Sequence, residues 1–244
     1  MQLADADFNR DGFAVLPQFL SRADCRELQR LTPQIVAAAE RWHANGEPLW
    51  FLQDDIPALA ALLKQPHLIK QLQTAAGLQG RHLELLAITL YSRRPGDPGT
   101  AWHQDARFIP TDRLPALSLW LPLQSIDARN SPLQFLSGSH HHCLLQQPQP
   151  AHSPPVGLPM NQPFVASPMD FGDATIHAPW SLHGARSNRS SSIRHALIVN
   201  WLYAPLSLHD EPELHGHLHP PVINTLRHQN HRTLQRRLSH LKAQ

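Results

Sequence analysis

Four consecutive residues, Trp102-His103-Gln104-Asp105, contain two side chains that could bind one metal ion. Side chains on a β-strand alternate between its two faces, so those of His103 and Asp105 are expected to point the same way. An imidazole nitrogen and a carboxylate oxygen aimed at one point are two thirds of a 2-His-1-carboxylate facial triad. This ligand set suits non-haem Fe(II) and leaves coordination positions open. Because the chain has 18 histidines, the H-x-D pattern alone is weak evidence.

His183 is the best candidate for the third ligand. It follows a predicted strand at 174–176, which Gly172-Asp173 introduces, so it is expected at the end of a sheet rather than on a solvent loop. A histidine in such a place is more often structural than a ligand, so its assignment depends on the surrounding motifs.

Arg194 is the candidate anion-binding residue. It opens an apolar predicted strand directly after the polar turn at 187–192. A single arginine that faces into a small barrel is costly unless it meets an anion, and its planar guanidinium matches a carboxylate in two hydrogen bonds. Arg186 and Arg189 fall near or in the turn and are expected in solvent.

The predicted secondary-structure elements that must position these residues change from mostly helices to mostly strands near residue 80. Before it, the pattern predicts a short strand at 12–16, a helix from Arg22 towards His43 with Ser21 as its N-cap, and short helices at 56–63 and 66–76. Pro33 predicts two helices or one kinked helix. Short strands with frequent turn signals follow, which predicts a β-sandwich or jelly roll with helices packed on one sheet. The predicted strands are 83–93, 102–105, 117–123, 133–136, 164–166, 174–176 and 193–202.

The composition favours a folded globular protein over nucleic-acid-binding, disulfide-rich and membrane proteins. The 244 residues are 41% hydrophobic and 16% charged, which indicates a folded globule. The net charge of +2 gives no case for binding nucleic acid. Cys25 and Cys143 are too few for a disulfide framework. The N-terminus lacks a signal-peptide pattern and no apolar run approaches a membrane span. We therefore expect a cytoplasmic protein without membrane partners, as a monomer or homodimer.

Taken in order, several motifs resemble the phytanoyl-CoA dioxygenase-like branch of the Fe(II)/2-oxoglutarate oxygenases over almost the whole chain. Each motif is weak by itself, but the ordered set is specific. The departures are Arg93-Arg94, where relatives often have a lysine before Pro-Gly, and Ser131, where a glycine is usual. The matching segments are 8–13, 102–105, 119–123, 131–133, 137–140, His183-Gly184 and Arg194.

This resemblance implies a mainly β fold with flanking α-helices around a double-stranded β-helix core, a jelly-roll or cupin-like arrangement. It implies one domain over 1–244, with a mostly helical part at 1–80, the core at 83–205, and a loop and helix at 206–244. It also implies roles for individual residues. His103, Asp105 and His183 would bind Fe(II), Arg194 would hold the distal carboxylate of 2-oxoglutarate, and Trp120 and Arg93 would lie beside this cosubstrate.

The implied reaction is oxidative. Such an enzyme uses O2 and 2-oxoglutarate to hydroxylate or otherwise oxidise an unactivated C–H bond, with release of succinate and CO2. Asp105 argues against a halogenase, because related halogenases have Ala or Gly at this position. Without a carrier-protein or CoA-binding signature, a small metabolite of secondary metabolism is the expected substrate. Arg107 is the candidate for binding an anionic group on it, and Phe108 and Trp180 are candidate lining residues.

Two alternatives stay open at this point. A cupin-like metal-binding or sensor protein would keep the triad without turnover, and a non-redox zinc enzyme could use the same ligands. Other histidine-rich segments compete for a metal role. We expect His140-His141-His142-Cys143 to be a solvated loop, because consecutive residues cannot all converge on one ion. The segment 215–219 lies among prolines and is expected to be an irregular surface stretch.

Overall fold

The computed structural model describes residues 6–44, 51–105, 116–141 and 163–203. The described part contains helices in its N-terminal third and strands after it, as the sequence predicts. The helices are α1 (Phe8–Asp11), α2 (Arg22–Ala44), α3 (Leu52–Asp55), α4 (Pro57–Leu63) and α5 (Pro66–Ala75). The strands are β1 (Phe13–Leu16), β2 (Leu83–Arg93), β3 (Thr100–His103), β4 (Ala116–Pro122), β5 (Leu133–Phe135), β6 (Phe164–Val165), β7 (Ala174–His177), β8 (His183–Ala185) and β9 (Arg194–Tyr203).

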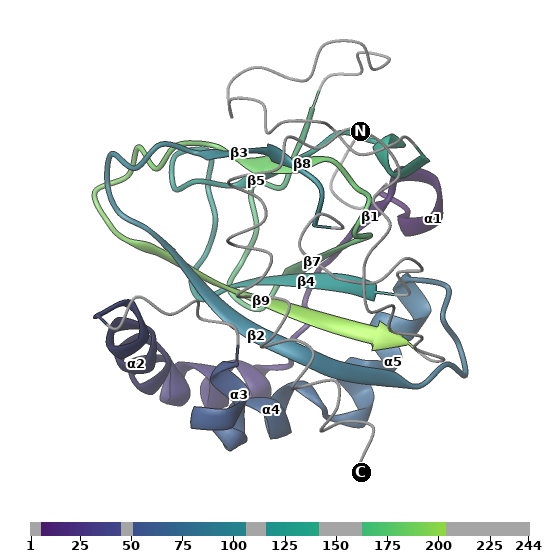
Figure 1. Cartoon of the computed structure of the whole chain (residues 1–244), viewed down its shortest axis with the longest axis horizontal. Helices are drawn as coiled ribbons and strands as arrows, with labels where there is room; N and C mark the ends of the chain where they lie inside the picture. Colours follow the sequence, from purple (N-terminus) through teal and green to yellow (C-terminus); the bar gives the residue numbers. More distant parts are fainter. Residues whose placement is uncertain (1–5, 45–50, 106–115, 142–162, 204–244) are drawn as a thin grey trace, which may run out of the picture.

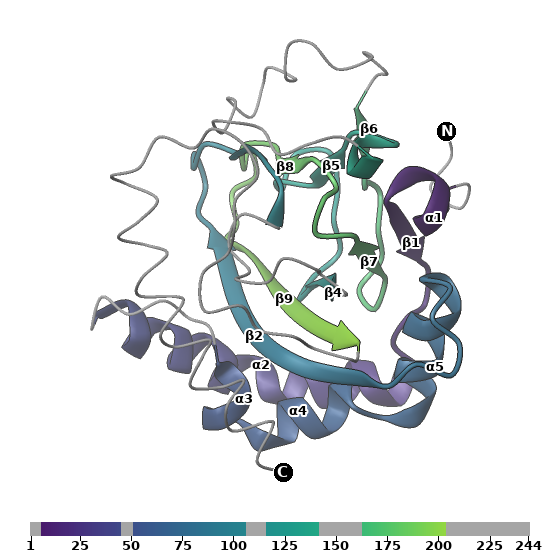
Figure 2. The same ribbon diagram turned by 45° about the vertical axis from the view of Figure 1, so that its right-hand side comes forward.

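The strands form two facing antiparallel sheets. The larger has the order β1-β7-β4-β9-β2, and the smaller has the order β3-β8-β5-β6. Helices α2 to α5 cover the outer face of the larger sheet, and the smaller sheet lies on its other side (Figures 1 and 2). This is the predicted double-stranded β-helix with helices on one sheet.

Residue alternation along the strands divides the larger sheet into two chemically different faces. In β9, Leu197, Val199 and Trp201 join the apolar cluster that includes the helices. The intervening Ala196 and Ile198 pack into a second cluster that includes residues of the smaller sheet. Since the period of a strand is two, Arg194 and Asn200 share this inner face. Arg194 and Asn200 are therefore enclosed between the sheets.

Helix α2 continues through Pro33, so of the two predicted outcomes the break into two helices is wrong. A proline inside a helix removes one backbone hydrogen bond and costs about 3 kcal/mol. Pro33 lies on the exposed face, where water can hydrogen-bond the carbonyl that loses its partner. Leu28, Leu31 and Ile35 are buried on the opposite face, and their packing keeps the helix continuous.

Hydrogen bonds to Asp24 connect the start of α2 to α5. Asp24 Oδ2 accepts hydrogen bonds from the Ser21 backbone N–H at 3.0 Å, the Ser21 hydroxyl at 2.6 Å and His67 Nε2 at 2.8 Å. The Ser21 hydroxyl oxygen in turn accepts the Asp24 backbone N–H at 3.2 Å, which confirms Ser21 as the N-cap. Burial raises the pKa of Asp24, but the bonds from Ser21 and His67 outweigh it, and the net pKa is lowered.

We expect Asp24→Ala to lower the free energy of unfolding at pH 7 by about 1–2 kcal/mol. Because the pKa of Asp24 is lower in the folded state, its contribution is present at neutral pH and is lost as the pH falls below about 4. The variant should thus lose less stability on acidification than the wild type, as measured by urea unfolding at several pH values. Glu27→Ala, at an exposed pair with Arg30, should change little. Equal acid sensitivity of Asp24→Ala and wild type would contradict this account.

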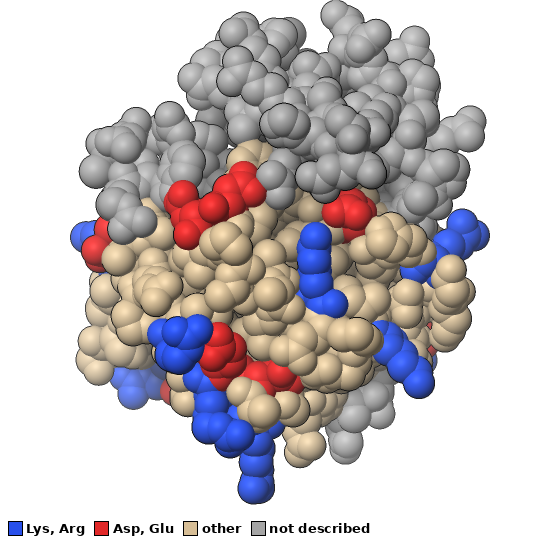
Figure 3. Space-filling view, turned by 90° about the horizontal axis from the view of Figure 1, so that it is seen from below, with Lys and Arg blue, Asp and Glu red and all other residues tan. Residues whose placement is uncertain are grey.

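The outer face of the helices carries basic and acidic side chains interspersed with uncharged ones (Figure 3). Its described residues therefore form no continuous basic surface of the kind that binds nucleic acid. Within the described part of the chain, no helix combines the length and apolar character needed to span a membrane.

Candidate metal centre

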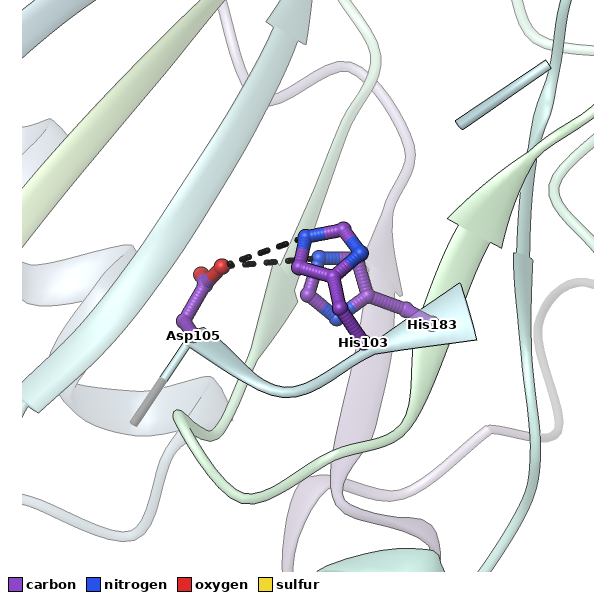
Figure 4. Close-up of side chains that lie close together, drawn as sticks. All are labelled: His103, Asp105 and His183. Atoms are coloured by element: carbon purple, nitrogen blue, oxygen red, sulfur yellow. Dashed lines mark ion pairs between the residues drawn. The ribbon is translucent and has the colours of Figure 1, made fainter. Parts of the chain in front are cut away.

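The structure brings His103, Asp105 and His183 together between the sheets, and Figure 4 shows all three side chains converging. His103 and His183 are register partners on the neighbouring strands β3 and β8. Asp105 Oδ1 lies 3.6 Å from His103 Nε2 and 3.7 Å from His183 Nε2. Metal–ligand bonds of roughly 2.0–2.2 Å can bridge atoms at such separations. The three residues could therefore hold one metal ion.

Two details of the strands differ from the prediction. Strand β3 ends at His103, so Asp105 lies just beyond the strand and not within it. The two side chains still converge, because the short segment after β3 turns Asp105 towards the histidines (Figure 4). His183 was expected at a sheet end, and it begins a short strand, β8, that the sequence did not predict.

Gly184 explains how β8 can approach β3 so closely. A Cβ atom at this position would lie 2.8 Å from the backbone oxygen of Thr100. Any larger residue would push the two strands apart. The glycine after His183 thus allows the imidazole rings of His103 and His183 to lie with centroids 4.2 Å apart.

Hydrogen bonds to the backbone set the tautomers of both histidines. His103 Nδ1 lies 2.8 Å from the Ala101 carbonyl oxygen, and His183 Nδ1 lies 3.0 Å from the Ser181 carbonyl oxygen. A carbonyl can only accept, so each Nδ1 carries a proton, and in the neutral ring Nε2 then keeps its lone pair. Both lone pairs are then available to a metal, as is usual for histidine ligands held by a second hydrogen bond.

The charge of Asp105 suits a cation site. Burial raises the pKa of this carboxyl group, but His183, His177 and His103 together outweigh burial and hold it far below its usual range. Burial, followed by the charges of His103 and His177, lowers the pKa of His183 well below its ordinary value. At neutral pH Asp105 is thus a carboxylate and His183 a neutral imidazole, the protonation states that metal binding requires.

His177, at the end of β7, is a site residue that the sequence reasoning missed. It is 1% exposed, and its ring centroid lies 4.3 Å from that of His183. Its Nε2 lies 3.1 Å from Asp105 Oδ2. Since the ionised carboxylate can only accept, His177 Nε2 carries the proton, unlike Nε2 of His103 and His183. His177 is therefore a hydrogen-bond donor to the cluster and not a fourth ligand in this arrangement.

Arg194 starts β9 on the same inner face and is 2% exposed. Its Nη2 donates to the Ser131 hydroxyl at 3.1 Å, its guanidinium carbon lies 5.6 Å from the ring centroid of Trp120, and its Nε is buried without a partner. Among the described residues it has no acidic ion-pair partner. Burial, followed by the charge of Arg93, lowers the pKa of Arg194 to about 9. A buried cation with an unused donor fits a site for an external carboxylate.

The cluster of three candidate metal ligands and the buried Arg194 lie within one jelly roll, which can be compared with known families. The family model described as phytanoyl-CoA dioxygenase (PhyH) matches residues 8–196, which include the triad and Arg194. The chain belongs to the PhyH family. This membership supports a 2-oxoglutarate-dependent non-haem iron oxygenase. Comparison with curated protein sequences returned no match.

Solved structures of similar fold agree with the PhyH assignment. EvdO2 from Micromonospora carbonacea var. aurantiaca, in complex with 2-oxoglutarate, is 21% identical, with 85% of this chain and 92% of that chain covered and a TM-score of 0.65. The epimerase SnoN from nogalamycin biosynthesis is 19% identical, with 90% and 95% covered and a TM-score of 0.63. The non-haem monooxygenase ThoJ is 16% identical, with full coverage of both chains and a TM-score of 0.67.

Ser131, one of the departures from the PhyH pattern, has a backbone reason. Its φ is +64°, in the left-handed region where glycine is favoured, which explains the usual glycine. The serine hydroxyl makes two hydrogen bonds that offset the cost of this backbone conformation. It donates to the Arg186 carbonyl at 2.6 Å and accepts from Arg194. Ser131 therefore adds a contact that holds the guanidinium of Arg194.

Arg93, the other departure, pairs in register with Arg194 and donates to the Thr100 hydroxyl. It thus lies beside Arg194, the candidate cosubstrate residue. Trp180 is partly exposed, and its carbonyl accepts from Gln104 Nε2 at 2.6 Å. Arg107 and Phe108 lie outside the described residues, so the predicted substrate contacts of these two stay predictions.

Tyr91 is a further inner-face residue that the sequence reasoning did not single out. The residue is 45% exposed, yet burial is the largest cause that raises its pKa, followed by the charge of Asp105. Tyr91 therefore lies on the inner face of the larger sheet, within electrostatic range of Asp105.

Of the histidine-rich segments, the structure describes only His140 and His141, and neither belongs to the cluster. His140 lies in the short 3-10 helix Ser139–His141, and its Nε2 is 3.1 Å from the Asn9 carbonyl oxygen. His142, Cys143 and the segments 215–219 and 206–244 lie outside the described residues, so the predictions for them are not tested.

Proposed function

We propose that this protein is an Fe(II)- and 2-oxoglutarate-dependent oxygenase that oxidises an unactivated C–H bond of a small metabolite, with release of succinate and CO2. The observation that carries this proposal is the pairing of the His103–Asp105–His183 cluster with Arg194, a buried cation without an acidic partner among the described residues. A metal-binding protein without turnover would need the cluster but not the arginine.

The residues present fit both groups. His103 Nε2, His183 Nε2 and one oxygen of Asp105 would hold the iron. Arg194 would bind the distal carboxylate of 2-oxoglutarate, with Ser131 fixing the guanidinium and Trp120 packing against it. Thr175, the cross-strand neighbour of Trp120, has a buried hydroxyl without a partner among the described residues, which also suits a bound polar molecule. When bound, iron, 2-oxoglutarate and O2 supply the oxidising power.

The chain's own residues would orient the substrate and limit water. Tyr91 would contact the substrate, because its side chain is exposed and lies within electrostatic range of Asp105. The apolar inner-face residues around Trp120 would keep the cosubstrate end dry, where an arginine–carboxylate pair is strongest.

Hydroxylation is the outcome we favour, with desaturation or ring formation as variants of the same oxidation. Retention of Asp105 leaves the carboxylate where a halogenase of this family would have Ala or Gly. The structurally similar SnoN is an epimerase and SnoK a carbocyclase, both from nogalamycin biosynthesis. These relatives support a natural-product intermediate as substrate. We further propose one domain over 1–244, acting in the cytoplasm as a monomer or homodimer.

A product assay tests this function. The protein is loaded with Fe(II) and given 2-oxoglutarate, O2 and a panel of natural-product intermediates that includes those of nogalamycin biosynthesis. We expect succinate to form at a rate that a true substrate increases, together with substrate oxidised by two electrons. Metal-loaded protein that forms no succinate with or without substrate would favour the sensor alternative. Activity with Zn²⁺ that needs neither O2 nor 2-oxoglutarate would favour the zinc enzyme.

A further inference from the structure

Three polar side chains form a row across the inner face of the larger sheet. His177 on β7 is the register partner of Ser118 on β4, and Ser118 is the register partner of Asn200 on β9. All three are buried, on strands whose neighbouring inner positions include the apolar Ala196 and Ile198. Buried polar groups cost free energy unless they are hydrogen-bonded, so such a row needs partners.

Two of these three side chains donate hydrogen bonds to a single oxygen atom of Asp105. The Ser118 hydroxyl donates to Asp105 Oδ2 at 2.7 Å, and His177 Nε2 donates to the same oxygen at 3.1 Å. The amide of Asn200 donates to the Ser118 oxygen at 2.9 Å. This last bond fixes the direction of the hydroxyl, because a serine that accepts from Asn200 has its own proton free for Asp105.

The other oxygen of the carboxylate has a different environment. Asp105 Oδ1 faces His103 Nε2 and His183 Nε2 at 3.6 and 3.7 Å, distances too long for hydrogen bonds. In the neutral rings, the backbone contacts of Nδ1 leave the lone pair on both of these Nε2 atoms. One oxygen is thus held by two donors from the larger sheet, and the other is directed at the metal position.

We propose that His177, Ser118 and Asn200 are positioning residues that keep Asp105 a one-oxygen ligand. This inference rests on the proposed function and deepens it. A carboxylate bound through both oxygens would occupy a further coordination position, and 2-oxoglutarate chelation and O2 together need every position that the triad leaves open. Because the row hydrogen-bonds Oδ2, this oxygen is kept from the metal. The open coordination positions are then left for 2-oxoglutarate and O2.

The test separates metal binding from cosubstrate binding. Ser118→Ala and His177→Leu each remove one donor to Oδ2, whereas His177→Gln keeps an N–H at a similar reach. In protein loaded with Co(II) alone, we expect the visible absorption of Ser118→Ala and His177→Leu to change from that of wild type as the second oxygen binds. Affinity for Co(II) should be retained or increased. His177→Gln should restore the wild-type spectrum.

In Fe(II)-loaded protein without O2, the same two variants should bind 2-oxoglutarate at least tenfold more weakly, about 1.4 kcal/mol. Asn200→Ala, which leaves both direct donors in place, should show a smaller loss in the same direction. Ser92→Ala is the matched control, because Ser92 bonds His195 at 2.7 Å on the opposite face of the same sheet. It should match wild type in both measurements.

Unchanged Co(II) spectra in Ser118→Ala and His177→Leu would overturn the proposal. Parallel losses of metal affinity, cosubstrate affinity and folding stability would also overturn it, because they would indicate a merely structural role. If Ser118→Ala does not fold, the comparison of His177→Leu with His177→Gln decides. Altered Co(II) spectra in a protein whose wild type binds no 2-oxoglutarate would support the positioning row and contradict the proposed function.

Discussion

Asp105→Ala should abolish turnover while the protein remains folded. The change removes the anionic ligand and leaves only the two histidine ligands, together with donors on Ser118 and His177 that lose their acceptor. His103→Ala and His183→Ala should have the same effect, because each removes one of the two available Nε2 lone pairs. We expect activity to fall on the order of 10³-fold or more, since metal catalysis supplies several kcal/mol. The measurements are succinate formation and bound iron per chain, with circular dichroism as the check on folding.

Histidines outside the cluster provide the controls. His140→Ala and His217→Ala should leave the iron content unchanged. If His103→Ala, Asp105→Ala or His183→Ala keeps near-wild-type activity, that residue is not a ligand and the proposed triad is wrong.

Arg194→Lys should weaken 2-oxoglutarate binding while iron is retained. Lysine keeps the positive charge but loses the planar pair of donors that matches a carboxylate. Loss of a charge-assisted pair of this kind costs on the order of 2–4 kcal/mol, roughly 30- to 1,000-fold in affinity. The dissociation constant can be measured by calorimetry on metal-loaded protein without O2. Arg186→Ala and Arg189→Ala should change it little, because both side chains are exposed.

Arg194→Met tests a second property of Arg194, its effect on the stability of the ligand-free protein. The guanidinium is buried without an acidic partner among the described residues, and burial lowers its pKa to about 9. An apolar side chain of similar length should therefore leave the stability of the ligand-free protein unchanged or raise it by about 1–3 kcal/mol. A large loss of stability would show that Arg194 is a structural residue and would weaken its assignment to the cosubstrate.

Local patterns in the sequence were enough to predict most elements. Strand β2 agrees with the predicted 83–93, and α4 and α5 differ from their predictions by one residue at one end. The very short elements α1, α3 and β8 were missed, because three or four residues carry too little periodicity to stand out. The continuity of α2 through Pro33 depends on packing against other elements, which no local pattern reveals.

The sequence likewise predicted some residues of the candidate site and missed another. His103, Asp105, His183 and Arg194 belong to ordered motifs and were singled out in advance. His177 was not, because its role depends on the register of β7 with β4 and on contact with Asp105, 72 residues away. A signal was present in β7, where polar Thr175 and His177 alternate with Ala174 and Ile176. Such alternation predicts polar side chains on an enclosed face, but it does not say what they contact.

We propose that iron held by His103, Asp105 and His183 binds 2-oxoglutarate together with Arg194. The most direct test is anaerobic titration of 2-oxoglutarate into Fe(II)-loaded protein, followed by visible absorption. We predict a weak metal-to-ligand charge-transfer band that saturates at one 2-oxoglutarate per chain and needs far higher concentrations in Arg194→Lys. Folded, iron-loaded wild type that develops no such band at saturating 2-oxoglutarate would contradict the claim.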